Sequence, residues 1–122
     1  MKIAFTTSGN TLEDAIDPRF GRCDNFLIYD DSEDSSYSIR NEGSSSGGGA
    51  GIKAAQTLID NGVNVVITGN VGPNAFKTMS LAGIEIHSNA SGKIKDTLAK
   101  YREGSLGQGV SGPTVGPHHG TQ

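Results

Sequence analysis

The chain has 122 residues and a formal net charge of −3, from ten Lys and Arg against thirteen Asp and Glu. This length fits one domain with a single modest core, and the charge argues against a general nucleic-acid binder because it implies no basic face. The sequence contains one cysteine, so an internal disulfide is excluded.

The first residues of the chain read as a strand and show no charged-then-apolar leader. No apolar run approaches the roughly 20 residues that a membrane span needs. We therefore expect a cytoplasmic protein that binds neither membranes nor nucleic acid.

The first part of the chain is rich in strand formers separated by polar segments. Strands are expected at residues 2–7, 26–29 and 37–40. Residues 8–25 show no hydrophobic period, and loops of more than about 12 to 15 residues in compact domains are usually functional or disordered. Residues 30–36 are acidic but lack the central glycine and final glutamate of an EF-hand, so we expect a solvated turn rather than a calcium loop.

The middle of the chain reads as a linker, a helix and a buried strand. Residues 41–49 form a Ser/Gly linker. A helix then starts near Gly51 and ends at Asn61 and Gly62, which suit a left-handed C-terminal cap. Helical spacing predicts that its inner face holds Ile52, Ala55, Leu58 and Ile59. Residues 63–68 are a nearly unbroken β-branched run, which favours the middle of a parallel sheet.

Two helices and one strand complete the predicted pattern. The helices are expected from Pro73 to Gly83 and from Ser91 or Gly92 to Gly104. The inner face of the first of these should hold Phe76, Met79, Leu81 and Ala82. A short strand at residues 84–87 lies between them. Residues 105–122 are rich in Gly, Pro and Ser, so we expect a mobile tail after a domain of residues 1–104.

This order of elements predicts a topology. A meander of three strands followed by right-handed crossovers gives an α/β fold with three helices and a mixed five-stranded sheet in the order 3-2-1-4-5. Ligands of open α/β sheets lie outside the carboxyl ends of the strands. We therefore expect the loops at residues 8–23 and 69–74 to lie side by side and to form the site.

One glycine pattern suggests a known kind of ligand site. Gly49, Gly51 and Ala54 match the spacing of the G-x-G-x-x-A dinucleotide fingerprint. That fingerprint needs a buried strand before it and an acidic residue about 20 positions later, whereas a polar linker precedes it here and Asn70 stands at the acidic position. Two interpretations stay open, a linker that ends in a close-packed helix start and an anion site at a helix N-terminus.

Cys23 is a candidate functional residue in the first loop. It follows Arg19 and Arg22, and positive neighbours lower the pKa of a thiol and favour the thiolate. Cys23 could therefore be a redox thiol, a nucleophile or a metal ligand. The alternative is a small apolar residue in the core.

Histidines and carboxylates offer fewer candidates. His87 is the possible base inside the fold, and a structural histidine is the alternative. His118 and His119 in the tail form a weak candidate site for a soft or borderline metal. The first and fourth strands contain no carboxylate at residues 3–7 and 63–68, which argues against a metal-dependent nuclease or phosphotransferase.

Several segments together resemble a known family. They are R-F-G-R-C at residues 19–23, G-G-A-G-I at 48–52, V-I-T-G-N-V-G-P-N-A-F at 66–76 and A-G-I at 82–84. In this order they resemble the dinitrogenase iron-molybdenum cofactor biosynthesis family over roughly residues 1–104. The resemblance implies a ribonuclease H-like motif, and binding of an iron-sulfur or molybdenum-containing cluster rather than catalysis.

The resemblance also implies a site. Cofactor contacts are expected from Arg19, Arg22, Cys23, Gly49, Gly51, Lys53, Gly69, Asn70, Gly72 and Asn74. Metal-sulfide clusters are anionic, so the cationic side chains and the helix N-termini would supply charge and amide contacts. Cys23, His118 and His119 are the candidate metal ligands, and one chain holds too few cysteines for a Cys₄ iron-sulfur cluster.

The sequence therefore predicts a non-catalytic carrier of a metal cluster or its precursor, which would work with cofactor-assembly proteins. The alternative function is a regulatory module that binds a small anion or a nucleotide. Visible absorption after anaerobic reconstitution separates the two, because a metal-sulfide cluster is coloured.

Overall fold

The computed structural model describes residues 1–44, 48–106, 109 and 112. Its elements are β1 (Lys2–Thr7), β2 (Asn25–Asp30), β3 (Ser35–Arg40), α1 (Ala50–Asp60), β4 (Val65–Ile67), α2 (Pro73–Leu81), β5 (Glu85–His87) and α3 (Ile94–Arg102). Every predicted element is present, although β4 is shorter than the predicted strand at residues 63–68. Within the described ranges, no helix is long and apolar enough to cross a membrane.

The five strands form one mixed sheet in the predicted order β3-β2-β1-β4-β5. The meander of β1, β2 and β3 is antiparallel: the long loop at residues 8–24 reverses the chain between β1 and β2, and the short turn at residues 31–34 reverses it between β2 and β3. The crossovers through α1 and α2 make β1, β4 and β5 parallel. The predicted α/β fold class and strand order are confirmed.

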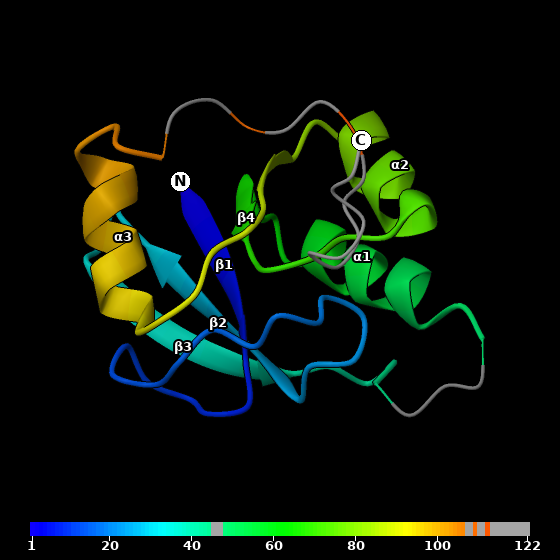
Figure 1. Ribbon diagram of the computed structural model, residues 1–122, viewed down its shortest axis with the longest axis horizontal. Coiled ribbons are helices and arrows are strands. Elements are labelled where there is room, and N and C mark those ends of the chain that lie inside the picture. Colours follow the sequence, from blue (N-terminus) through cyan, green and yellow to red (C-terminus); the bar gives the residue numbers. More distant parts are fainter. Residues whose placement is uncertain (45–47, 107–108, 110–111, 113–122) are drawn as a thin grey trace.

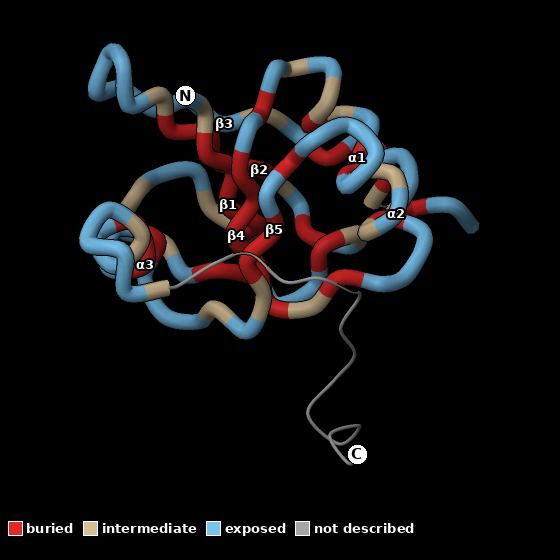
Figure 2. Tube along the Cα trace, turned by 90° about the horizontal axis from the view of Figure 1, so that it is seen from above, coloured by how far each residue is buried: buried red, intermediate tan, exposed pale blue. Residues whose placement is uncertain are grey.

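Helices cover both faces of the sheet, with α1 and α2 on one face and α3 on the other (Figure 1). The side chain of Ala4 belongs to the core cluster under α1 and α2, whereas Ile3 and Phe5 belong to the cluster under α3. The central strands are therefore buried on both sides, and the buried residues run through the middle of the molecule (Figure 2).

The helices are rotated relative to the inner faces predicted for them. In α1 the buried residues are Ala50, Ala54, Ala55 and Leu58, while Ile52 is 44% exposed. In α2 the buried residues are Ala75 and Met79, while Leu81 is 80% exposed. The predictions for Ile52, Leu81 and the exposed Ala82 are therefore wrong, whereas those for Ala55, Leu58 and Met79 are confirmed. Small alanines let α1 pack closely, and Leu81 is the last residue of α2, where the chain turns towards β5.

The described residues after α3 stay against the domain. Leu106 is half-buried and packs on the cluster under α3. A Cβ atom built on Gly109 would lie 2.9 Å from the carbonyl oxygen of Ile86 in β5. Residues 107–108, 110–111 and 113–122 of the predicted tail, with His118 and His119, lie outside the described residues.

Candidate anion-binding cleft

The loops that follow β1 and β4 lie side by side at the carboxyl end of the sheet, as the predicted topology requires. The backbone nitrogen of Asn70 donates to the carbonyl oxygen of Pro18 at 2.8 Å, and that of Phe20 donates to the carbonyl oxygen of Asn70 at 3.3 Å. Beneath them, the buried hydroxyl groups of Thr6 and Thr68 are hydrogen-bonded at 2.7 Å. These contacts fasten the two loops to each other.

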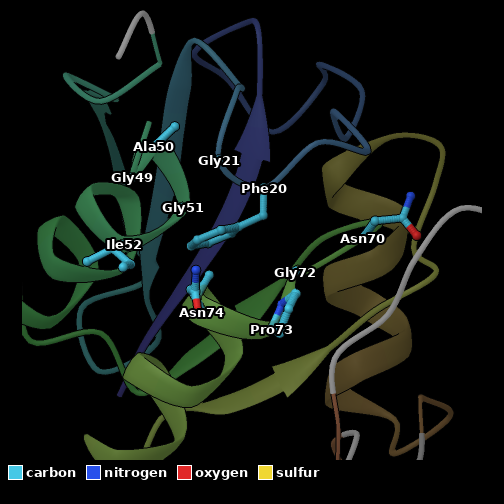
Figure 3. Close-up of a pocket in the computed structure, with 11 residues that line it drawn as sticks. Phe20, Gly21, Gly49, Ala50, Gly51, Ile52, Asn70, Gly72, Pro73 and Asn74 are labelled. Atoms are coloured by element: carbon cyan, nitrogen blue, oxygen red, sulfur yellow. The ribbon is translucent and has the colours of Figure 1, made fainter. Parts of the chain in front are cut away.

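A cavity of about 230 Å³ opens where these loops meet the beginnings of α1 and α2. Five of the predicted site residues line it, namely Gly49, Gly51, Asn70, Gly72 and Asn74. The ring of Phe20 reaches between the beginnings of the two helices, and the side chain of Asn70 points away from that ring (Figure 3). Four of the lining residues are the glycines Gly21, Gly49, Gly51 and Gly72, which expose backbone atoms to the cavity.

Both helices present unpaired ends to this cavity. The first hydrogen bond within α1 runs from Lys53 N to Gly49 O, and the first within α2 from Phe76 N to Gly72 O. The N–H groups that precede these bonds have no partner in their own helix. Neither helix has a side-chain cap or an acidic residue in its first turn. Two partial positive charges therefore converge on one cavity.

The third helix shows the opposite arrangement. The nitrogen of Ile94 donates to the carbonyl oxygen of Asp14 at 2.9 Å, and that of Lys95 donates to Leu12 at 2.9 Å. Asp96 lies in the first turn, where a carboxylate offsets the positive end of the helix dipole. The N-terminus of α3 is thus already satisfied by the chain, whereas the first turns of α1 and α2 have no such side-chain cap or carboxylate.

The three motif segments approach one another closely because glycines, which have no side chain, stand at their contacts. A Cβ atom on Gly21 would lie 3.0 Å from the nitrogen of Gly51, and one on Gly51 would lie 3.3 Å from the Cβ atom of Ala75. Gly49, the residue before α1, has a φ of 74°, which side-chain-bearing residues rarely adopt. The motifs R-F-G-R, G-G-A-G and G-P-N-A-F are therefore distant in sequence but form one frame around the cavity.

The predicted cationic residues lie outside the lining of the cavity. Arg19 is paired with Asp17 through its Nε and Nη2 atoms, at 3.1 and 2.9 Å. Burial raises the pKa of Asp17, but the hydrogen bonds and charge of Arg19 outweigh it, so the pKa falls below its ordinary value. Arg22 donates to the carbonyl oxygen of Ser44 at 3.0 Å, and Lys53 is exposed on α1. Arg22 and Lys53 contribute positive charge near the cavity, whereas Asp17 offsets the charge of Arg19.

The structure does not place Cys23 in the cavity as an accessible ligand. Its side chain is fully buried, and its sulfur lies 3.4 Å from the carbonyl oxygen of Phe20. Burial raises the pKa of the Cys23 thiol to about 12, so the thiolate expected from the neighbouring arginines does not form. The arginine side chains extend into solvent, and Cys23 packs into the core instead.

Side-chain ligands for a metal are missing from the described part of the chain, where no group of three His, Cys, Asp or Glu residues could hold a metal ion. His87 is buried, lies 2.5 Å from a carboxylate oxygen of Glu85 and packs edge-on against Tyr101. It therefore has the structural role that the sequence left open. Gly69 also has a structural role, because it lies against Pro18 rather than in the lining.

Sequence reasoning missed two parts of the site. Ala50, Ile52 and Ala75 line the cavity outside the two loops expected to form it, and their place inside the motifs is the signal that could have identified them. Asn41, assigned to a linker, is 1% exposed and hydrogen-bonds to the loop beneath the cavity. Its signal was the glycine two residues later, since Asn followed by such a glycine is typical of a structured turn.

Comparison with known proteins gives consistent matches. A family model described as dinitrogenase iron-molybdenum cofactor matches residues 1–104. An uncharacterised protein of Methanocaldococcus jannaschii is 31% identical over 112 residues, which covers 87% of this chain and 89% of that protein.

Two solved structures are also similar. The apo form of the orange protein from Desulfovibrio gigas superposes with a TM-score of 0.89 and 33% identity, covering 93% of this chain and 96% of that one. A putative NifB protein from Thermotoga superposes with a TM-score of 0.75 and 30% identity, covering 85% and 89% of the two chains.

Proposed function

The chain belongs to the dinitrogenase iron-molybdenum cofactor family, and on that premise we propose that it is a non-catalytic carrier of an iron-sulfur or molybdenum-containing cluster or a precursor of one. The observation that carries the proposal is the convergence of two uncapped helix N-termini on one cavity. A metal-sulfide cluster is an anion, and the first-turn N–H groups of a helix bind anions through hydrogen bonds and the helix dipole.

The size of the cavity favours a compact ligand. Pockets for drug-sized organic molecules usually enclose about 300–1,000 Å³, whereas this cavity measures about 230 Å³. A whole nucleotide would leave its base and ribose outside, and Asn70 stands where a ribose-binding carboxylate would be needed. A small metal-sulfide anion fits the volume and the charge better than the nucleotide of the alternative function.

A carrier must also release its cargo. In the described part of the chain, the cavity lining contains no Cys, His or carboxylate side chain. Backbone N–H groups would then hold the cluster, with long-range attraction from Arg22 and Lys53. Such contacts leave the metal atoms free to accept ligands from a cofactor-assembly protein, which is the partner that we propose.

The relatives support this reading. The relative from Desulfovibrio gigas is described as the apo form of the orange protein. The relative from Thermotoga is described as a putative NifB protein. Both match this chain over more than four fifths of its length.

The test is an anaerobic titration with tetrathiomolybdate, a coloured dianion, followed by visible absorption and equilibrium dialysis. Asn74→Asp places a carboxylate at the start of α2, where it stabilises the helix but repels an anion. The matched control is Asn64→Asp, the same charge change at the amino end of β4, where the Asn64 side chain accepts a bond from Lys2 N that a carboxylate would keep.

We expect binding by the parent chain and by Asn64→Asp, and at least about tenfold weaker binding by Asn74→Asp with an unchanged melting temperature. Equal binding by all three chains would show that the anion binds elsewhere. If the parent chain binds ATP at micromolar concentration but takes up no tetrathiomolybdate, the carrier function is wrong and the regulatory alternative replaces it.

A further inference from the structure

We infer that Asn41 is a positioning residue for the cleft, which it shapes by holding two glycines against the first turn of α1. This inference deepens the proposed function and rests on it only for the nature of the ligand. Asn41 directly follows β3, and only 1% of its surface is exposed.

The side chain of Asn41 ties the first loop to the segment before α1. Its Nδ2 atom donates to the carbonyl oxygens of Gly21 at 3.2 Å and Cys23 at 2.9 Å. Its Oδ1 atom accepts from the nitrogen of Gly43 at 3.2 Å. One buried amide thus satisfies three backbone groups from two segments.

Main-chain bonds strengthen the same junction. The nitrogen of Asn41 donates to the carbonyl oxygen of Asp24 at 2.8 Å, and its own carbonyl oxygen accepts from Ser44 N at 3.1 Å. Arg22 adds a bond from its guanidinium to the carbonyl oxygen of Ser44. The segment at residues 41–44 is therefore anchored to the loop and does not behave as a free linker.

The two glycines that Asn41 holds both touch the beginning of α1. A Cβ atom on Gly21 would lie 3.0 Å from the nitrogen and 3.1 Å from the Cα atom of Gly51. A Cβ atom on Gly43 would lie 2.7 Å from the Cβ atom of Lys53. The N-terminus of α1 is thus supported on two sides, and the direction of its N–H groups depends on the Asn41 amide.

Replacement of the amide by a carboxylate tests this dependence without a change of size. In Asn41→Asp an oxygen replaces the donor and faces two carbonyl oxygens, which repels the loop from the segment at residues 41–44. The matched control is Asn25→Asp, because the half-buried Asn25 side chain makes a comparable bond to the carbonyl oxygen of Gly9, in a part of the loop that does not line the cavity.

The first readout needs no ligand. In ¹⁵N–¹H spectra of the folded chain, Asn41→Asp should shift the amide signals of Gly51 and Ile52, and Asn25→Asp should leave them in place. If Asn41→Asp does not fold, Asn41→Ser serves instead, because it removes the bridging amide without adding charge. Unshifted Gly51 and Ile52 signals in a folded Asn41 variant would overturn the inference.

The second readout is the affinity for tetrathiomolybdate, corrected for the folded fraction. We expect about tenfold weaker binding by the Asn41 variant, the size of one lost well-made contact, and parental affinity for Asn25→Asp. Parental affinity in both variants would assign Asn41 a purely structural role. A parent chain that binds no tetrathiomolybdate would contradict the proposed function, while the amide signals would still decide the role of Asn41.

Discussion

Gly69→Ala should separate the two loops on which the cleft is built. Gly69 is buried between β4 and Asn70, and a Cβ atom at this position would lie 2.5 Å from the Cα atom and 2.8 Å from the carbonyl oxygen of Pro18. Carbon atoms pack at about 3.5–4.0 Å, so the two backbones would have to separate by about 1 Å. The bond from Asn70 N to Pro18 O, now 2.8 Å, would then exceed hydrogen-bonding distance.

The cost follows from these contacts. Overpacking of a core site costs about 1–3 kcal/mol, and each of the two backbone bonds between the loops contributes about 0.5–1.5 kcal/mol. We expect a loss of about 2–6 kcal/mol from the free energy of unfolding, a large share of the 5–15 kcal/mol typical of a domain. The melting temperature should fall by roughly 4 °C for each kcal/mol in a chain of this size.

Urea unfolding followed by circular dichroism measures the loss, and Gly48→Ala is the matched control. A Cβ atom on Gly48 would meet nothing within 4 Å, and its backbone is not left-handed, so its stability should change by less than about 0.5 kcal/mol. Tetrathiomolybdate affinity should fall in Gly69→Ala and persist in Gly48→Ala. Equal unfolding free energies in the two variants would refute the close approach of Gly69 and Pro18.

Three further outcomes are expected. The ion pair with Arg19 stabilises the folded chain while Asp17 is ionised, so this stability is present at neutral pH and is lost as the pH falls below about 4 and then through the lowered pKa of Asp17. Arg19→Gln should therefore reduce the difference in unfolding free energy between pH 7 and pH 3. An undiminished difference would show that the pair does not cause the pH dependence. The Cys23 thiol, with its pKa raised to about 12, should resist alkylation at pH 8 until urea unfolds the chain; rapid alkylation of the folded protein would restore it as a candidate ligand. Truncation after Gly104 should lower the melting temperature more than truncation after Leu106, because only the first removes the half-buried Leu106 side chain. Burial of that side chain contributes about 1 kcal/mol to the free energy of unfolding. Identical melting temperatures would contradict the contact.

The fold was predictable because local signals and topology agree. The β-branched run before Gly69 marks a strand buried on both faces, and Pro73 marks the start of α2. Once the strand order is set, the position of the site follows, because the carboxyl ends of β1 and β4 are neighbours in the parallel part of the sheet. Five of the predicted site residues consequently line the cavity.

Burial could not be predicted from neighbours in the sequence. Cys23 follows two arginines, yet their guanidinium groups bond to Asp17 and Ser44 while the thiol packs into the core. Asn41 stands at the start of a Ser/Gly-rich segment, yet its amide is the centre of a buried junction. The core around Cys23 and the bonds from Asn41 to Gly21 and Cys23 join residues that are distant in the chain, so the local pattern shows only the turn from Asn41 to Gly43.

Whether the cluster is held by side-chain charges or by backbone N–H groups determines how the proposed carrier would respond to salt and to a recipient protein. Exposed guanidinium and ammonium groups lose most of their effect at high ionic strength, whereas N–H groups that line a cavity are screened much less. Salt should therefore slow loading more than it weakens the final complex, since Arg22 and Lys53 are exposed and Gly51 and Asn74 line the cleft. A recipient that offers thiolate or imidazole ligands would then remove the cluster, because bonds from these ligands to soft metal centres are stronger than hydrogen bonds from backbone amides.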